Sequence, residues 1–165
     1  MENRITIVEY DHHYQPAFER LNRWWIERYF EMEAIDEFVL TQPDAAIIQP
    51  GGAIMIALYN DVPAGAAALR KLSNGMFEFT KMGVDEAFQR KGIAEALCHA
   101  CFEKAASFGA KEVILYSNSV LKPAIRLYEK LGFKHLPVDN TEYKRSDVKM
   151  IIDLEEVLNL KHINL

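Results

Sequence analysis

The sequence predicts an α/β (α+β) fold in which a mixed, mostly antiparallel sheet is flanked by helices. Two observations carry this prediction. The first half of the chain has turn signals of the hairpin type, at 60–63 and at Asn74-Gly75, and hairpins join antiparallel strands. The second half alternates strand-like and helix-like segments, which adds a strand, helix, strand, helix unit to the sheet. With 165 residues, 50% of them apolar, the chain can bury a core without a disulfide or a metal.

The first forty residues predict one strand and two helices. Residues 5–10 form the first apolar, strand-like run. Pro16 suits the first turn of a helix, where its missing N–H would be unpaired in any case. The large apolar residues that follow it at helical spacing are Phe18, Leu21, Trp25 and Tyr29. The segment 31–40 is expected to continue as a second, shorter helix.

Three strands are expected in the centre of the chain. Residues 53–59 are an unbroken apolar strand, and the turn at 60–63 leads to its hairpin partner at 64–71. Asn74-Gly75 favours positive φ at both residues, so it closes a second two-residue hairpin. The strand 77–84 should therefore pair antiparallel with the strand before it.

The second half predicts two helices and two strands. A long helix is expected to begin near Ile93, and Gly109 suits the position just past its end. Its apolar stripe, at helical spacing, consists of Ala94, Leu97, Cys98, Cys101, Ala105 and Phe108. A buried strand at 113–116, a helix at 123–131 and a late strand at 148–154 follow.

Charge and composition exclude several partners. The chain has 19 Lys and Arg against 24 Asp and Glu, a net charge of −5, so it lacks the basic footprint that nucleic acid or an anionic membrane requires. The longest uncharged segment, 45–60, is broken by Pro50-Gly51-Gly52 and is too short to span a bilayer. The residues before the first strand form no apolar segment of the secretory type, so we expect no secretory signal. We expect a cytoplasmic protein with no nucleic-acid or membrane partner, and a single domain over 1–165.

Cys98 and Cys101 are the chain's two cysteines. They are too few and too close for a disulfide framework, and no second pair supplies the remaining ligands of a metal site. Because both thiols fall on the apolar stripe of a helix, we expect them to pack in the core. The sequence predicts no metal.

The segment Gln89-Arg90-Lys91-Gly92-Ile93-Ala94 joins a strand to the long helix. A helix N-terminus presents unpaired N–H groups and about half a positive charge, Gly92 allows close approach of a ligand, and two basic side chains add charge. This is an anion cradle suited to a pyrophosphate. No Ser or Thr follows a Gly-Lys pair and Gly-x-Gly-x-x-Gly is absent, so kinase and dinucleotide functions lose their main support.

This segment and its flanks resemble the Gcn5-related N-acetyltransferase (GNAT) superfamily. Residues 89–94 match the (Gln/Arg)-x-x-Gly-x-(Gly/Ala) motif that binds the acetyl-CoA pyrophosphate, and 77–84 looks like the family's fourth strand. Residues 124–133 match the family's Ala-x-x-Leu-Tyr-x-Lys-x-Gly-Phe segment. Order and spacing agree over about 77–133.

The resemblance implies a fold and a function. The fold is GNAT-like, with the sheet splayed between its fourth and fifth strands. The function is direct transfer of acetyl from acetyl-CoA to an amine of a small molecule, an amino acid or a peptide. A catalytically silent GNAT-fold module that binds acyl-CoA or docks on a partner is the alternative. The apolar tail at 154–165 either docks on the domain or contacts a second copy in a homodimer.

The resemblance also implies which residues bind the cofactor. Pantetheine is expected to lie between the splayed strands and to bond to backbone at Met82, Gly83 and Val84, whose N–H groups would stabilise the oxyanion. The pyrophosphate is expected at Gln89, Arg90, Lys91, Gly92, Ile93 and Ala94. The family's pantetheine-contacting Asn is replaced by Leu121. Asn118, or the hydroxyls of Ser117 and Ser119, could take its place.

Two side chains are candidates for catalysis. Tyr128 matches the family's general acid, since a phenol with a pKa near 10 stays protonated at pH 7 and can protonate the leaving thiolate. The alternative is a Tyr128 that only packs on the core. Glu78 is the best candidate base, directly or through a water, and the alternative is a salt-bridged strand carboxylate, paired for example with Lys81.

Two features concern the acceptor side. The acidic run Glu31, Glu33, Asp36 and Glu37 falls in a region that usually walls the acceptor site of this family. It is either a solvated face or an attractor for a cationic amine. Trp24 and Trp25 cannot face the same way on a helix, so Trp25 is expected in the core and Trp24 at a pocket or interface.

Overall fold

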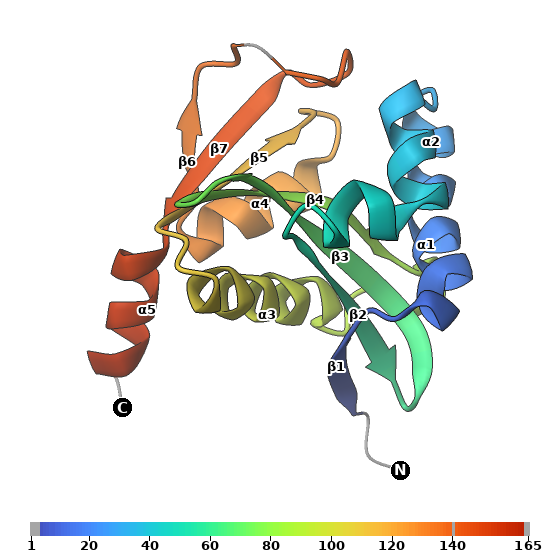
Figure 1. Ribbon diagram of the computed structural model, residues 1–165, viewed down its shortest axis with the longest axis horizontal. Helices are drawn as coiled ribbons and strands as arrows, with labels where there is room; N and C mark the ends of the chain where they lie inside the picture. The colour runs from blue at the N-terminus through green and yellow to red at the C-terminus, as the bar shows by residue number, and fades with distance from the viewer. Residues whose placement is uncertain (1–3, 140, 164–165) are drawn as a thin grey trace.

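A seven-stranded sheet forms the centre of the computed structural model, which describes residues 4–139 and 141–163 (Figure 1). The strand order is β1-β2-β3-β4-β5-β7-β6. The strands are β1 (Ile5–Glu9), β2 (Ala53–Tyr59), β3 (Val62–Ser73), β4 (Met76–Val84), β5 (Glu112–Ser117), β6 (Lys134–Leu136) and β7 (Val148–Asp153). Every neighbouring pair is antiparallel except β4 and β5, which are parallel. The predicted mixed, mostly antiparallel sheet is confirmed.

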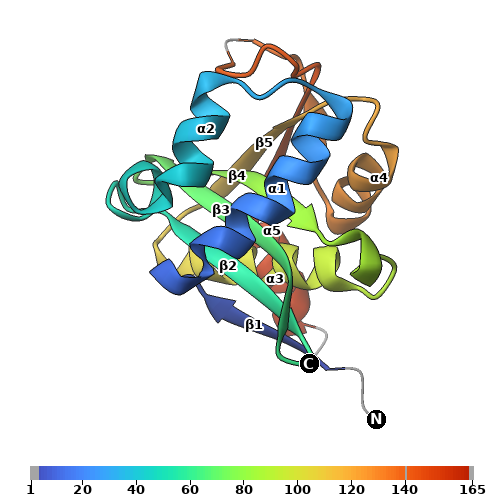
Figure 2. The same ribbon diagram turned by 90° about the vertical axis from the view of Figure 1, so that its right-hand side faces the viewer.

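Helices cover both faces of the sheet. On one face lie α1 (Gln15–Tyr29) and α2 (Ala34–Thr41), and on the other lie α3 (Ile93–Ser107) and α4 (Lys122–Leu131) (Figures 1 and 2). Alternate residues of β2 point to opposite faces, so that Ile54 packs against the α1 and α2 layer and Met55 against the α3 and α4 layer. The result is two hydrophobic cores, one on each face of the sheet.

The parallel pair of strands separates along its length. β4 and β5 pair only at Met76, Phe77 and Glu78, opposite Glu112, Val113 and Ile114. Beyond that point β4 continues to Val84 beside β3, while β5 stays paired with β7 to its end. The predicted splay between the fourth and fifth strands is confirmed.

A bulge interrupts β4 where the strands separate. Thr80 lies opposite Ala68 and Gly83 opposite Ala66, so two residues, Lys81 and Met82, oppose one residue of β3. Lys81 has a left-handed backbone with φ of 53°, which costs a non-glycine residue about 1–3 kcal/mol unless its surroundings hold it. The bulge reverses the alternation of side chains along the strand.

The hairpin turns correct one expectation. Asn74 and Gly75 do close the β3–β4 hairpin, but neither has positive φ, whereas Asn60 and Asp61 of the β2–β3 turn do, at 48° and 70°. The β3–β4 hairpin carries a register shift beside its turn. In addition, the Gly75 carbonyl is turned outward to accept the Lys111 and Glu112 N–H groups at the start of β5.

Several elements were not expected from the sequence. These are β6, a short π-helical turn at Asp44–Ile48 and the helix α5 (Leu154–Ile163). The second helix begins at Ala34 rather than near 31, because Glu33 caps it: Glu33 accepts from a first-turn N–H and the Asp36 carboxylate accepts from the Glu33 N–H.

The tail predicted to dock on the domain or to form a homodimer folds as α5, and the first residues of this helix pack on the body of the protein. Leu154 is buried, and Val157 and Leu158 pack partly against the α3-side core. Of residues 159–163 only the backbone is described, as part of α5. The homodimer remains a prediction.

Other expectations can be compared directly. Cys98 and Cys101 are fully buried, which confirms that they pack in the core. Among the residues that the structure describes, no three His, Cys, Asp or Glu side chains gather in a way that could hold a metal ion. Within the same residues, no helix has the length and apolar character needed to cross a membrane.

Candidate active site

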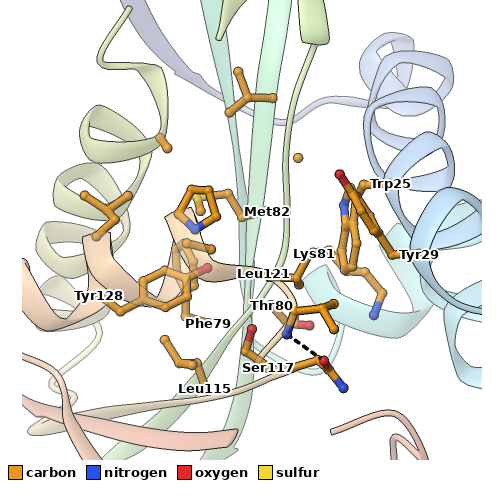
Figure 3. Close-up of a pocket in the computed structure, with 18 of the residues that line it drawn as sticks. Trp25, Tyr29, Phe79, Thr80, Lys81, Met82, Leu115, Ser117, Leu121 and Tyr128 are labelled. Carbon is orange, nitrogen blue, oxygen red and sulfur yellow. Dashed lines mark hydrogen bonds between the residues drawn. The ribbon is translucent and has the colours of Figure 1, made fainter. Parts of the chain in front are cut away.

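A cavity of about 630 Å³ opens where β4 and β5 separate. Its walls come from the second half of β4, the start of α3, the end of β5, one side of α4, the C-terminal half of α1 and the loop before β7. In Figure 3, Tyr128 enters from one side, Trp25 and Tyr29 from the other, and Met82 lies between them. Most of the residues predicted to bind the cofactor line this cavity.

The predicted phosphate loop has an unusual backbone. Arg90 and Gly92 both adopt left-handed conformations, with φ of 64° and 83°, and Gly92 is the N-cap of α3, where no side chain caps the helix. A Cβ added at Gly92 would meet nothing within 4 Å. Backbone of this kind turns successive N–H groups toward one concave site, which suits an anion at a helix N-terminus.

The structure brings most of the predicted cofactor residues together. Those that line the cavity are Met82, Gly83, Val84, Gln89, Arg90, Gly92, Ile93, Ala94, Asn118 and Tyr128. Lys91 does not line it, because its Nζ atom lies 5.3 Å from the ring centroid of Tyr59, over β2. The geometry therefore leaves Arg90 as the predicted basic residue of the loop that reaches the cavity.

Gly83 sets the distance between α1 and β4. A Cβ at this position would lie 2.2 Å from the backbone oxygen of Leu21, so only glycine lets helix and strand backbones approach this closely. The close approach brings Trp24, Trp25 and Tyr29 of α1 to the cavity wall. The expectation that Trp25 is a core residue is therefore incomplete, since its ring also faces the site.

Trp24 has an unsatisfied polar atom. Its indole Nε1 is buried and, among the described residues, has no hydrogen-bond partner, whereas Nε1 of Trp25 donates to Asn22 at 3.0 Å. Buried N–H groups are nearly always paired. The Trp24 indole is a donor that a bound molecule could satisfy.

Tyr128 is buried, with 7% of its surface exposed, and its ring meets Phe79 and Phe133 edge-on at 6.0 and 5.7 Å. Tyr128 also lines the cavity, with its hydroxyl directed toward Met82 (Figure 3). Burial raises the pKa of Tyr128, and the Cys98 thiol adds to that rise. The side chain is therefore a neutral phenol at pH 7 on the cavity wall, so packing and proton donation are compatible at this position.

Glu78 lies elsewhere. Its side chain is 1% exposed, belongs to the paired part of β4 and does not line the cavity. Its Oε1 atom lies 3.2 Å from Nε of Arg70, on the neighbouring strand. Burial raises the pKa of Glu78, and the charges of Arg70 and Lys81 oppose that rise. The salt-bridged alternative thus describes the contacts of Glu78, with Arg70 as the partner.

Both polar atoms of the Asn118 side chain already form hydrogen bonds within the protein. Its Nδ2 donates to the Arg145 carbonyl at 2.6 Å and its Oδ1 accepts from the Val120 N–H at 2.9 Å. Ser119 is bound to Asp147. Ser117 lines the cavity (Figure 3). Of the alternatives for the missing family Asn, Ser117 is the hydroxyl on the cavity wall.

A buried charge cluster adjoins the cavity at Lys81 and Arg145, on the α2 side where the resemblance leads us to expect the acceptor; we call this part the acceptor end. Asp36 of α2 accepts from Nη1 and Nη2 of Arg145 at 2.7 and 2.8 Å and pairs with Nζ of Lys81 at 2.9 Å. Burial raises the pKa of Asp36, but the hydrogen bonds from Arg145 and the charge of Lys81 outweigh it and hold the pKa well below its usual range. Arg145 is not predictable from the sequence, since an isolated Arg in an irregular loop belongs to no pattern.

The acidic run is corrected by these contacts. None of Glu31, Glu33, Asp36 and Glu37 lines the cavity. Asp36 is neutralised by two cations, and Glu37 accepts from Nη1 of Arg23 at 2.7 Å. The solvated alternative does not fit Asp36, which is buried and paired, and these contacts give no support to attraction of a cationic amine by this run.

Comparison with known proteins places the chain. The sequence model of the acetyltransferase (GNAT) family matches residues 18–133. An Escherichia coli protein named uncharacterized N-acetyltransferase YjgM is 32% identical over 111 residues, which cover 64% of this chain and 66% of that protein. N-acetylaspartate synthetase from Xenopus tropicalis is 34% identical over 91 residues, 54% of this chain and 34% of that protein. The chain thus spans less than two thirds of the length of these relatives.

A solved structure extends the likeness to the fold. The structure of yncA from Salmonella typhimurium, determined with its cofactor acetyl-CoA, has a TM-score of 0.72 and covers 92% of this chain and 94% of that one. Its sequence identity is 20%. At this identity the likeness shows a shared fold.

Proposed function

Because the chain belongs to the acetyltransferase (GNAT) family, we propose that it transfers the acetyl group of acetyl-CoA directly to the amine of a small molecule, an amino acid or a peptide. One observation carries the proposal. A single cavity joins the uncapped N-terminus of α3, the unpaired half of β4 and the hydroxyl-bearing face of Tyr128. These are an anion site, a channel edge and a proton donor in one place.

The residues of the cavity fit acetyl-CoA. The left-handed Arg90 and Gly92 backbone and the first N–H groups of α3 would hold the pyrophosphate, with the Arg90 side chain beside it. The pantetheine arm would run along the edge of β4 that faces β5, past Ser117 and Leu121. Bound there, acetyl-CoA supplies the activated acetyl thioester.

The backbone of β4 would stabilise the negative charge that develops on the acetyl oxygen. Met82, Gly83 and Val84 follow the bulge at Lys81, on the segment that has left β5. Each well-aimed N–H of this kind is worth roughly 2.7–4 kcal/mol in comparable sites. This role requires no side chain, so the bulge and Gly83 matter for where they place the backbone.

Tyr128 would act as the general acid. In the transfer the amine nitrogen forms a bond to the acetyl carbon, the carbon–sulfur bond breaks, and the Tyr128 proton passes to the departing sulfur. The proton lost by the nitrogen leaves to solvent, and a proton from solvent returns to the Tyr128 phenolate, which restores the acid for the next turnover. Glu78 is buried beside Arg70, so we assign it no role as a base. The acceptor would instead arrive as the neutral amine, already deprotonated in solvent, and would need no carboxylate base before it attacks.

The test is thiol release from acetyl-CoA with a panel of primary amines. The proposal predicts release that depends on the amine and that saturates with both substrates. The name of the N-acetylaspartate synthetase relative indicates an amino-acid product for that protein, so amino acids belong in the panel. Binding of CoA without amine-dependent release would instead support the silent acyl-CoA-binding module.

A further inference from the structure

The acceptor end of the cavity is electrically polarised. Four charged side chains meet there, namely Lys81, Arg145, Asp36 and Glu33. Both cations line the cavity and neither carboxylate does. The cluster is neutral in sum, yet its positive side faces the cavity. A ligand group placed there is favoured if it is anionic and disfavoured if it is a second cation.

Arg145 has hydrogen-bonding capacity left on that side. Nη1 and Nη2 bind Asp36 end-on, and Nη1 also lies 3.4 Å from Oε2 of Glu33. Among the described residues nothing accepts a hydrogen bond from Nε of Arg145. This Nε is not among the fully buried polar atoms that lack a partner. The edge formed by Nε and Nη2 matches the two oxygens of a carboxylate.

The guanidinium is held in place before any ligand arrives. It lies 5.1 Å from the ring centroid of Tyr143, 5.6 Å from that of Phe30 and 5.8 Å from that of Trp25. Asn118 grips the Arg145 carbonyl, and the loop is tied to β3 by a two-point ion pair between Glu142 and Arg70, at 2.9 and 3.1 Å. A fixed donor loses little entropy when it binds.

Arg145 is connected to the proposed reaction centre through Asp36 and Lys81. Lys81 shares the Asp36 carboxylate with Arg145 and directly precedes Met82 in β4. One carboxylate and one lysine side chain therefore separate the guanidinium from the backbone that would hold the acetyl oxygen. Arg145 and Met82 line the same cavity, so both can contact one small molecule bound there.

We propose that Arg145 binds the carboxylate of the acceptor, so that the amine acetylated by this chain is that of an amino acid. This inference rests on the proposed acetyl transfer and names its substrate class. The aromatic walls formed by Trp24, Trp25, Tyr29 and Phe30 suit an apolar or aromatic side chain on that amino acid. Polyamines are disfavoured, since they would bring a further cation to Lys81 and Arg145.

The first test compares acceptors that differ only at the carboxylate. Phenylalanine, methionine and leucine are each measured against the corresponding amide and the decarboxylated amine, with spermidine as the cationic comparison. The acids should exceed the amides by about tenfold to a hundredfold in kcat/KM, the effect of one charged two-point hydrogen bond. The amides have the more easily deprotonated amines, so amine basicity cannot produce this order. Equal rates, or faster reaction of amides or spermidine, would overturn the proposal.

The second test uses variants. Arg145→Gln should lower kcat/KM for the acids by a larger factor than for the amides, so that the preference for acids is lost, while Arg126→Gln, an exposed arginine of α4 outside the cavity, should leave the ratio of acids to amides unchanged. Arg145→Lys should recover part of the loss. If Arg145→Gln does not fold, the acid and amide series on the unaltered chain decides alone.

A binding measurement separates this proposal from the proposed function. With CoA present, the same amino acids should raise the melting temperature of the unaltered chain and not that of Arg145→Gln. Acetylation of amines without any preference for the acids would overturn the carboxylate site and keep the acetyltransferase. Absence of both a rate and a carboxylate-dependent thermal shift would overturn this proposal, and CoA-dependent stabilisation would then report separately on the cofactor site.

Discussion

Arg145 and Asp36 form a two-point ion pair, at 2.7 and 2.8 Å, that joins the loop before β7 to α2 across the acceptor end of the cavity. Lys81, at the bulge of β4, pairs with the same Asp36 carboxylate. One buried carboxylate thus connects the strand that would carry the acetyl group, the helices over the acceptor side and the loop that closes it. The shape of the site depends on this contact.

Asp36→Asn should destabilise the protein by about 3–5 kcal/mol, because it leaves two cations facing a neutral amide in a buried place. The measurement is urea unfolding at pH 7. Asp139→Asn, which alters an exposed partner of Lys149, is the matched control and should shift stability little. A similar small loss in both variants would show that the cluster does not hold the fold.

The same carboxylate should make the protein acid-sensitive. The folded pKa of Asp36 is lowered, so its contribution to stability is present above the unfolded value of about 3.9 and is lost as pH falls from there toward the folded value. Stability should therefore decline below about pH 4, and the decline should be shallower in Asp36→Asn than in the unaltered chain. Parallel pH profiles would contradict this assignment.

Gly92→Asp should abolish most of the rise in melting temperature that CoA produces. The change puts a carboxylate and a Cβ on the residue whose left-handed backbone opens the anion site. Gly75→Asp is the control, since Gly75 also has open space around it and lies in the β3–β4 turn without positive φ. Equal stabilisation of both variants by CoA, or equal stabilisation of the unaltered chain by pantetheine and by CoA, would place the phosphates elsewhere.

Tyr128→Phe should lower kcat by roughly 10–10³ while CoA affinity changes little, because the ring contacts with Phe79 and Phe133 remain and only the proton donor is lost. The loss should shrink with an acyl donor whose thiol leaves more easily. Tyr10→Phe, a tyrosine packed against Phe18 on the opposite face of the sheet, controls for hydroxyl removal. Unchanged kcat in a chemistry-limited assay would remove Tyr128 from the mechanism.

Glu78→Gln should keep kcat within a few-fold of the unaltered chain and leave the shape of the pH–rate profile intact, since the carboxylate is sealed beside Arg70 and outside the cavity. A folded variant that loses two or more orders of magnitude in kcat, with one limb of the pH profile missing, would restore Glu78 as the general base.

The features predicted correctly from the sequence are those that depend on local residue patterns. The hairpins, the apolar stripe of α3 and the glycines after α3 and α4 were visible because turn chemistry and helical spacing are local. The phosphate loop was recognisable for the same reason. The exchange of turn conformations between Asn74-Gly75 and Asn60-Asp61 was not, since the bulge in the second hairpin and the contact of Gly75 with β5 are tertiary effects.

Local sequence patterns did not predict the charge pairs on the acceptor side and around Glu78. Asp36 looked like one of several solvated acids, and only the fold brings Lys81 and Arg145 to it from a bulged strand and an irregular loop. Glu78 looked free to act as a base, but its partner Arg70 lies on the neighbouring strand. Charges are paired by distance in space, and that information is absent from spacing along the chain.

The central claim is that an acetyl group passes from acetyl-CoA to an amine in this cavity. The most direct measurement is mass spectrometry of one reaction containing the chain, acetyl-CoA with an isotopically labelled acetyl group and the amine that gives the fastest thiol release. Free CoA and labelled N-acetyl product should accumulate in equal amounts. Thiol release without labelled amide, or stabilisation by CoA with no turnover of any amine, would contradict the account.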